Sequence, residues 1–302
     1  MDAELRQKFL TPITLRLAQW GYDIIKWPPL TCAYDNQYQS PFFIIGCGRS
    51  GTTLLRSVLQ SHPDLHIPPE SMGRLPNCVK KYYRYGGLDW DDMVNVILGE
   101  FSSFETFYLW EISVEDVRQE LLKTEKKNQC LQNIIHTIYS HHLNRHKKGA
   151  LRWGDKSPFN TLRLNWIDKL FPQAQYIEII RDGRDVVSSF IKSGLINDHK
   201  AAAERWRKSL ENVEKLKKSI NADRFTTIYY EDLVNQPTMV AQKLCSFLNI
   251  DYKTDLINQR ETDLQDDDLP HMASVQKPVT TSSVGKWKER LSDKQKKYTI
   301  QS

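Results

Sequence analysis

The sequence has no apolar run long enough to cross a bilayer, and its first twenty residues alternate charged with apolar side chains, unlike a secretory signal. Its five cysteines are odd in number and contain no C-x-x-C pair, so neither a zinc site nor a disulfide framework is predicted. We therefore expect reduced thiols, no transmembrane segment and a cytoplasmic location. The cysteines are Cys32, Cys47, Cys78, Cys130 and Cys245.

A strong charge of either sign is also missing. The 302 residues contain 42 Lys and Arg against 37 Asp and Glu, a net charge of +5. This modest excess favours an anionic ligand over nucleic acid as a partner. With 40% apolar and 26% charged residues, the composition is typical of a globular protein, and we expect one domain over residues 1–302. Within it we expect an N-terminal helix and connector (1–40), a mostly helical insertion (71–150) and a C-terminal loop and tail (260–302).

A glycine-rich stretch follows the first strongly apolar run of the chain. The run Phe42–Ile45 has the length of a buried strand, and apolar positions from Leu54 onward have helical spacing. The turn between them suits a phosphate, because glycines let the backbone approach an anion and the helix N-terminus presents its N–H groups. The residues predicted to bind there are Gly48, Arg49, Ser50, Gly51, Thr52 and Thr53.

One residue departs from the usual nucleotide-binding pattern of this turn. The spacing from Gly46 to Gly51 matches G-x-x-x-x-G-K-[ST], but Thr52 stands where the lysine is expected. That lysine normally contacts the β and γ phosphates of a nucleoside triphosphate. Its absence disfavours such a ligand and indicates transfer of a less highly charged sulfuryl group from a 5′-phosphosulfate donor, which needs no metal.

The strings Arg49-Ser50-Gly51-Thr52-Thr53 and His62-Pro63-Asp64 resemble those of the sulfotransferases that use 3′-phosphoadenosine-5′-phosphosulfate (PAPS). The likeness is greatest to the branch that holds the tyrosylprotein and many bacterial sulfotransferases. It extends from about Pro41 to Leu291 and is weak between Ser71 and Ala150. The resemblance implies a three-layer α/β fold of the P-loop type with a mainly parallel central sheet flanked by helices, which the alternation of strand and helix patterns also favours.

Further cofactor contacts are implied by three later segments. Arg181, after the strand pattern Gln175–Ile180, and Ser189, eight residues on, match the family's ligands of the 3′-phosphate. Tyr230 opens a Y-E-D-L string whose tyrosine lies near the nucleotide in the family. Gly285 and Lys286 lie in a segment that resembles the one closing over the 3′-phosphate. The cytosolic members differ, because they have an Arg-Lys-Gly triplet in that segment and a tryptophan where this chain has Leu54.

The catalytic residues implied by the resemblance are Glu70, Lys156 and Arg49. Glu70 follows a short strand pattern and falls on the family's glutamate base, although alone it would be taken for a solvated loop carboxylate. Lys156, in Asp155-Lys156-Ser157-Pro158-Phe159, matches the lysine that contacts the bridging oxygen between phosphate and sulfate. Lys156 and Arg49 would stabilise charge on the leaving group.

Two other regions are less specific. Asp2–Trp20 has the apolar spacing of an amphipathic helix, and the insertion over 71–150 is rich in aromatic residues of the core or of an acceptor pocket. Its histidines lack acidic or cysteine partners at metal-site spacing and indicate a solvated basic helix face. They are His136, His141, His142 and His146.

We thus expect sulfuryl transfer from PAPS to a hydroxyl, leaving 3′-phosphoadenosine-5′-phosphate (PAP). The acceptor stays open among carbohydrate, lipid, phenol, peptide tyrosine and natural product. One alternative is a small-molecule kinase, which would need a P-loop lysine and an acidic metal ligand such as Asp182. The other is a non-catalytic PAP-binding protein, which would have little reason to keep Glu70 and Lys156.

Overall fold

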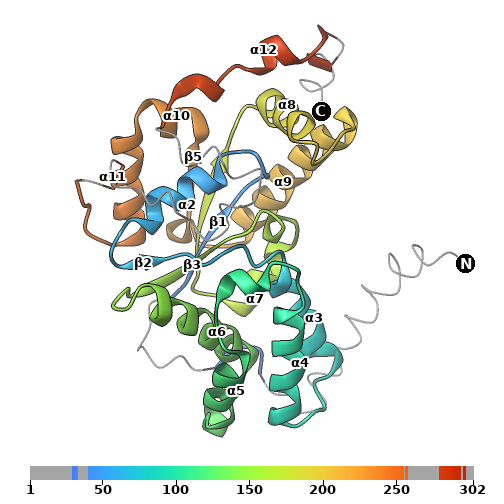
Figure 1. The fold of residues 1–302 in the computed structure, drawn as a ribbon, viewed down its shortest axis with the longest axis vertical. Helices are drawn as coiled ribbons and strands as arrows, with labels where there is room; N and C mark the ends of the chain where they lie inside the picture. Colours follow the sequence, from blue (N-terminus) through green and yellow to red (C-terminus); the bar gives the residue numbers. More distant parts are fainter. Residues whose placement is uncertain (1–28, 33–39, 255, 258–278, 294, 297–302) are drawn as a thin grey trace, which may run out of the picture.

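A central sheet of parallel strands organises the computed structural model, which describes residues 29–32, 40–254, 256–257, 279–293 and 295–296 (Figure 1). The sheet has five strands in the order β2-β3-β1-β4-β5, and every pairing between neighbours is parallel. The strands are β1 (Phe42–Ile45), β2 (Leu65–His66), β3 (Arg152–Lys156), β4 (Gln175–Ile180) and β5 (Phe225–Tyr229). The predicted α/β fold with a parallel sheet is therefore confirmed.

The strand order places β1 at the point where the direction of winding reverses. The chain passes from β1 to β2 and β3 on one side, and then crosses to β4 and β5 on the other. Ile44 pairs with Lys156 of β3 and with Ile177 of β4, so the carboxyl ends of these strands lie at one edge. Ligands of parallel α/β sheets bind at this edge, beside the point of reversal.

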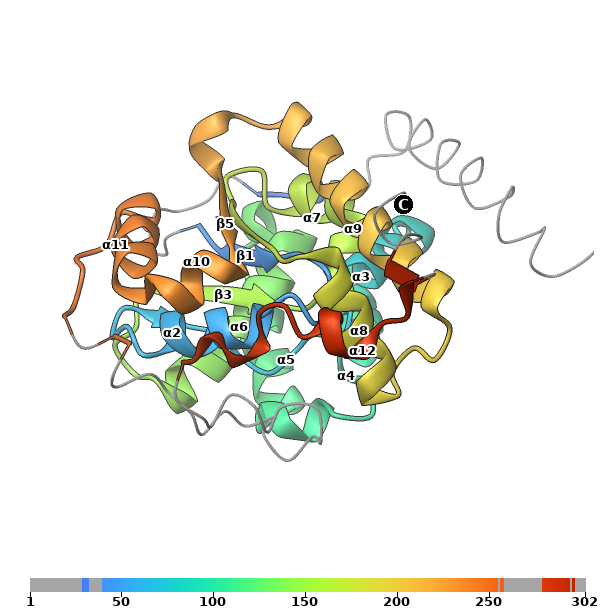
Figure 2. The ribbon, with the colours of Figure 1, turned by 90° about the horizontal axis from the view of Figure 1, so that it is seen from above.

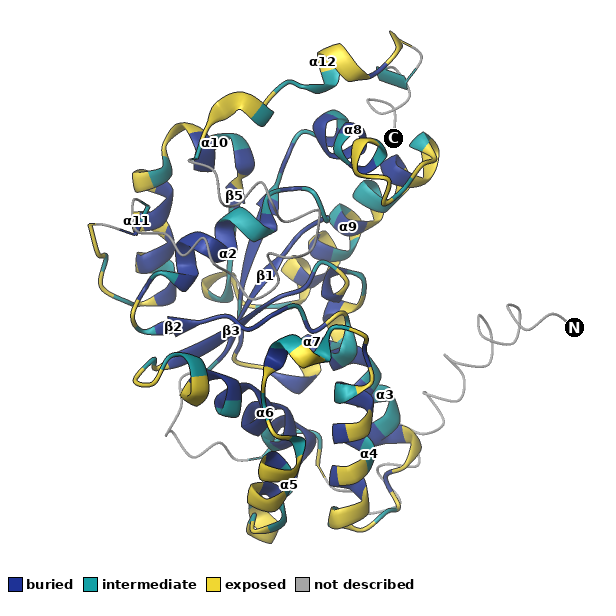
Figure 3. Ribbon diagram, viewed as in Figure 1, coloured by how far each residue is buried: buried dark blue, intermediate teal, exposed yellow. Residues whose placement is uncertain are grey.

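Helices cover both faces of the sheet, because the side chains of β1 alternate between two apolar cores. Phe42 and Ile44 pack with α2, α10 and α11, while Phe43 and Ile45 pack with the helices of the insertion and with α7. β1, β2 and β3 are buried along their whole length and β4 at all but its two end residues, whereas β5 at the edge of the sheet is mostly half-buried (Figure 3). The helices are α2 (Thr52–Gln60), α3 (Arg74–Arg84), α4 (Trp90–Ser102), α5 (Val114–Leu122), α6 (Leu131–His146), α7 (Leu164–Leu170), α8 (Gly183–Ser193), α9 (His199–Ser219), α10 (Tyr230–Asn235), α11 (Pro237–Leu248) and α12 (Trp287–Arg290).

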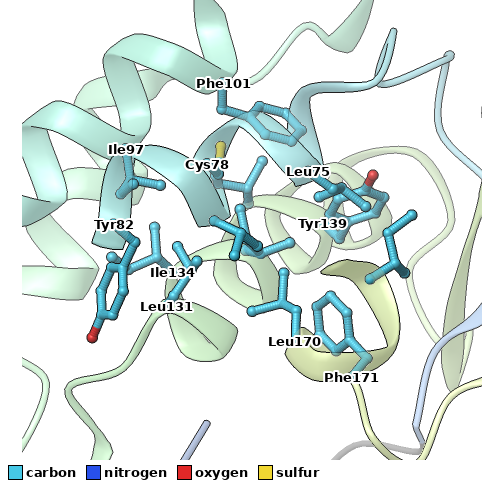
Figure 4. Packing of buried hydrophobic residues seen from close by; sticks show 14 of the residues in the cluster. Leu75, Cys78, Tyr82, Ile97, Phe101, Leu131, Ile134, Tyr139, Leu170 and Phe171 are labelled. Atoms are coloured by element: carbon cyan, nitrogen blue, oxygen red, sulfur yellow. The ribbon is translucent and has the colours of Figure 1, made fainter. Parts of the chain in front are cut away.

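The insertion between β2 and β3 consists of α3, α4, α5 and α6, as its mostly helical pattern predicts. Its aromatic residues belong largely to the core: Tyr82 and Trp110 are fully buried, and Phe101 packs edge-on against Trp110. Figure 4 shows this apolar cluster, in which side chains of α3, α4, α6 and α7 meet. Tyr108, by contrast, is 70% exposed.

Two expectations are wrong. Cys32 and Cys130 form a disulfide, with Cα atoms 5.8 Å apart, so only Cys47, Cys78 and Cys245 are the buried free thiols. The pairing could not be read from spacing, because the two cysteines are 98 residues apart and meet only when the connector reaches the start of α6. The cytoplasmic location depended in part on reduced thiols and stays a prediction.

The histidines of α6 do not form a solvated face. His136 and His142 are buried, and His142 Nδ1 lies 2.6 Å from His66 Nε2. Across the described ranges there is no cluster of three or more His, Cys, Asp or Glu side chains suited to a metal ion. None of the helices described there has both the length and the apolar character to cross a membrane. The predicted helix Asp2–Trp20 and the loop over 260–278 lie outside the described residues.

Candidate functional site

The glycine-rich turn connects β1 to α2, as its sequence predicts. Gly46 and Gly51 have φ of 146° and 94°, in the region that glycine alone enters readily. A Cβ on Gly51 would lie 2.4 Å from the ring of Tyr230, and one on Gly46 would lie 2.6 Å from the carbonyl oxygen of Ile179. Both glycines are therefore required by backbone conformation and by space, whereas Gly48 has ordinary room for a side chain.

Thr161 holds the start of this turn, a role that its sequence did not suggest. Its hydroxyl accepts a hydrogen bond from the Gly46 amide and donates one to the Gly46 carbonyl, each 3.0 Å long. Thr161 lies in the turn of 3₁₀ helix that follows β3, 115 residues from Gly46, and is fully buried. The far end of the turn, Ser50 and Thr52, is buried where α2 begins.

Two arginines meet at the opening of the turn. Arg49, with a left-handed φ of 69°, donates from Nε to Ser189 Oγ over 3.1 Å. Arg181 donates from Nη1 to the Arg49 carbonyl oxygen over 2.9 Å. Burial and the positive charge of Arg181 lower the pKa of Arg49. Two guanidinium groups so close together attract an anion, and the two separated residues Arg181 and Ser189 both reach the turn.

Tyr230 connects the turn to Arg181. It opens α10, directly after β5, and its ring lies against Gly51 on one side. The guanidinium of Arg181 lies 4.3 Å from the centre of the same ring. The Nε of Arg181 is buried and has no hydrogen-bond partner within the described residues, so its N–H can donate a hydrogen bond to one further acceptor atom. The tyrosine thus orients the arginine at the opening.

The C-terminal segment is held at the same place. Arg181 Nη2 donates to the Ser283 carbonyl oxygen over 2.6 Å. The carboxylate of Asp185 accepts hydrogen bonds from the amides of Gly285 and Trp287, at 2.7 and 2.9 Å. The segment lies across α8 in Figure 2. Sequence reasoning missed Asp185, although a carboxylate in the first turn of a helix beside predicted anion ligands is a signal for such a role.

The side chain of Lys286 forms an ion pair within the C-terminal segment. Its Nζ is 3.6 Å from a carboxylate oxygen of Glu289, and both side chains are exposed. Arg184, one residue before Asp185, stacks on Trp287 at 3.8 Å and also pairs with Asp182. Arg181 and Gly285 additionally line a cavity of about 1000 Å³ whose other walls include Trp206 and Trp287. Neither Ser189 nor the glycine-rich turn lines this cavity, so it lies beside the two-arginine opening.

A lysine and a carboxylate meet on the other side of the turn. Lys156 ends β3 and is buried, and its Nζ bonds the Glu70 carboxylate and lies 3.3 Å from Thr53 Oγ1. Glu70 follows β2 in the loop that leads to α3, and its side chain is 18% exposed. Neither side chain is an ordinary surface group. Because Thr53 belongs to the first turn of α2, the pair reaches the same helix start as the two arginines.

The chain matches a known protein family. The profile described as the sulfotransferase family matches residues 41–254, more than half of the chain. The chain is similar to protein-tyrosine sulfotransferase A of Caenorhabditis elegans, with 25% identity over 82% of this chain and 61% of the relative. It is also similar to the protein-tyrosine sulfotransferase of Drosophila melanogaster, with 24% identity over 83% and 48%. This chain thus spans about half to three fifths of the length of these two relatives.

A solved structure resembles nine tenths of the chain. The sulfotransferase domain of the Synechococcus PCC 7002 olefin synthase is 28% identical, with a TM-score of 0.62, and the match covers 90% of this chain and 96% of that domain. The family match over residues 41–254 includes the glycine-rich turn and the Glu70–Lys156 pair.

Proposed function

Because this chain belongs to the sulfotransferase family, we propose that it transfers a sulfuryl group from PAPS to a hydroxyl group of an acceptor. The observation that supports this best is Lys156, which contacts both the Glu70 carboxylate and Thr53 at the start of α2. A candidate base and a candidate charge stabiliser therefore lie next to a predicted phosphosulfate-binding turn. Such an arrangement suits attack of an oxygen nucleophile on a sulfuryl group.

The residues around the turn fit the two ends of the donor. The amides and hydroxyls of residues 48–53 would hold the 5′-phosphosulfate, since the required glycines leave the backbone open to an anion. Arg181 and Ser189 would hold the 3′-phosphate, and the buried Nε of Arg181 offers a donor for it. Tyr230 and Gly285 would adjoin this end of the molecule, while Lys286 would have to leave Glu289 to take part. When bound, the donor supplies the activated sulfuryl group.

The Glu70–Lys156 pair would carry the chemistry of this chain. Glu70 takes the proton from the acceptor hydroxyl as its oxygen attacks, an effect typically worth about 10²- to 10⁴-fold. Lys156, whose Nζ lies between Glu70 and the start of α2, stabilises negative charge on the departing phosphate, assisted by Arg49. Burial of Lys156 strengthens this electrostatic effect, because few waters screen it.

The kinase alternative receives no support from the structure. Its candidate metal ligand Asp182 accepts hydrogen bonds from the backbone and the guanidinium of Arg184 and is thus already neutralised. The lysine that contacts a γ-phosphate is absent, and Thr52 in its place is buried. A non-catalytic PAP-binding protein would have no need of a partly buried ion pair such as Glu70–Lys156.

For the acceptor we infer a tyrosine side chain of a polypeptide, since the two relatives named above are protein-tyrosine sulfotransferases. The exposed Tyr108 and Phe159 offer apolar contacts at the surface of the insertion and beside β3. An aliphatic alcohol is the comparison acceptor, because it represents the carbohydrate and lipid hydroxyls that the sequence left open.

The test is incubation of the protein with ³⁵S-labelled PAPS and either a tyrosine peptide, a small phenol or an aliphatic alcohol. Glu70→Gln should lower turnover on the order of 10²-fold or more while PAP affinity, measured by calorimetry, changes less than about threefold. The matched control is Glu204→Gln, which removes only an exposed ion pair with Lys208 on α9 and should leave turnover unchanged.

Two results would contradict the proposal. Undiminished turnover of the Glu70→Gln variant would remove Glu70 as the base. Thermal stabilisation by ATP with Mg²⁺, in the absence of stabilisation by PAP, would favour the kinase instead.

A further inference from the structure

A buried polar cluster lies directly behind the Glu70–Lys156 pair. Asp155 precedes Lys156 in β3 and therefore points to the opposite face of the sheet. It is 1% exposed. The Tyr139 hydroxyl donates to Oδ2 of Asp155, and the Asn160 side-chain amide donates to Oδ1, each over 2.6 Å. Two strong hydrogen bonds thus fix this carboxyl in the interior.

Ser71 joins the same cluster from the loop that carries Glu70. It is fully buried, and its hydroxyl lies 3.5 Å from the Asn160 amide and within hydrogen-bonding reach of Asp155. The Ser71 carbonyl also accepts a hydrogen bond from the Arg74 amide, where the chain turns into α3. Ser71 is the chain neighbour of Glu70, and Asp155 is the chain neighbour of Lys156. Both neighbours therefore belong to one hydrogen-bonded group behind the Glu70–Lys156 pair.

The cluster is attached to a part of the molecule that cannot move easily. The ring of Tyr139 stacks on Trp153 at 4.0 Å and meets Trp110 edge-on at 5.1 Å. Figure 4 shows Tyr139 among the apolar side chains of the large core. Burial raises the pKa of Asp155 to about 6, opposed by the hydrogen bonds from Tyr139 and Ser71 and increased by the nearby charge of Glu70. The Asp155 carboxyl therefore interacts electrostatically with the Glu70 carboxylate.

The Glu70 loop needs such an attachment. It leaves a strand of only two residues, β2, and continues through Met72 and Gly73, which have left-handed φ of 50° and 74°. The left-handed backbone of Met72, unlike that of Gly73, is strained, and such strain persists when neighbouring contacts determine it. A displacement of about 1 Å at a reacting group can cost on the order of 10²-fold in rate.

We propose that Asp155 is a positioning residue: by holding Ser71 against β3 and Tyr139, it keeps the Glu70 carboxylate in contact with Lys156. Its role rests on the proposed function, because it acts only through the base named there. Within the part of the chain that the structure describes, its carboxylate bonds Tyr139, Asn160 and Ser71, and not the predicted donor-binding turn or the two arginines. Its loss should therefore change turnover and leave donor binding unchanged.

The experiment is a double-mutant cycle that combines Asp155→Asn with Glu70→Gln. In the otherwise native protein, Asp155→Asn should lower kcat about 10- to 100-fold, with PAP affinity within about twofold. In the Glu70→Gln background the same change should lower the residual turnover less than about twofold, because no carboxylate remains to be positioned. The matched control is Asp198→Asn at the start of α9, where Asn caps the helix equally well and turnover should not change.

A second cycle with Tyr139→Phe removes a single hydroxyl and keeps the ring in the core, so it answers the same question if Asp155→Asn does not fold. Tyr139→Phe should lower kcat about 3- to 10-fold in the native background only. Equal losses in both backgrounds, or PAP affinity that falls in parallel with kcat, would show a merely structural role and overturn the inference. Native turnover of these variants, with Glu70→Gln inactive, would overturn it while leaving the proposed base in place. An active Glu70→Gln variant would instead refute the proposed function.

Discussion

Gly51→Ala tests the conformation of the glycine-rich turn and its contact with the rest of the site. Gly51 caps the N-terminus of α2 with a left-handed φ of 94°, and a Cβ there would lie 2.4 and 2.9 Å from two ring carbons of Tyr230. Those distances are well below van der Waals contact, so the ring must move. The same ring carries Arg181 on its face, which couples this one methyl group to the opening of the turn.

The expected loss of stability has two sources. A non-glycine residue in the left-handed region costs about 1–2 kcal/mol, and an added group in a filled space costs about 1–3 kcal/mol. The free energy of unfolding should therefore fall by about 2–5 kcal/mol. For a chain of 302 residues, an unfolding entropy of about 2.1 cal/mol/K per residue converts this to a fall in Tm of roughly 3–8 °C.

The functional loss follows from the displaced ring. A cation–π contact contributes about 0.5–2 kcal/mol, so PAP affinity should fall between about 2- and 30-fold. Differential scanning fluorimetry and calorimetric titration with PAP measure the two effects. The matched control is Gly99→Ala in α4, where no heavy atom lies within 4 Å of the added Cβ. That change should raise stability by about 0.5–1 kcal/mol and leave PAP affinity unaltered.

The reasoning fails if Gly51→Ala melts at the wild-type temperature and binds PAP as tightly as the parent. The turn would then not have the left-handed conformation at Gly51, or Tyr230 would not pack against it. A loss of stability without a loss of PAP affinity would refute only the coupling through Tyr230 to Arg181.

Three further outcomes are expected. Arg181→Lys should weaken PAP binding about tenfold in calorimetry, because an ammonium cannot keep a planar contact with Tyr230 and several directed hydrogen bonds at once. Cys130→Ser, or reduction of the wild type, should lower the free energy of unfolding by about 3–5 kcal/mol, since the bond to Cys32 closes a loop of 98 residues. A melting temperature that does not change with reductant would show that no disulfide forms. Burial lowers the pKa of His66 from 6.5 to about 3. Below pH 6.5 the unfolded chain therefore takes up a proton that the folded chain does not, so the free energy of unfolding falls as the pH drops from 6.5 toward 3. The urea midpoint should accordingly fall from pH 7 to pH 5 more in the wild type than in His66→Gln.

Local chemistry made the centre of the site predictable. A short apolar run, glycines at defined spacing and a helical pattern specify a strand, a turn and a helix through the conformations of neighbouring residues alone. The pairing of Arg181 with Ser189 came from the family resemblance, and the structure brings both residues into contact with Arg49. Glu70 and Lys156 could be located at strand ends in the same way, although their roles came from the family resemblance.

The rest depended on contacts between distant parts of the chain. Thr161 binds Gly46 across 115 residues, Asp185 binds the amides of Gly285 and Trp287 across about 100, and Cys32 meets Cys130 across 98. No periodicity or spacing encodes such pairs, because they form only after helices and sheet have packed. The sequence by itself determined which segments become strand, turn and helix. Only the tertiary structure decided which buried groups hold those segments in register, since burial and partner are properties of the packed interior.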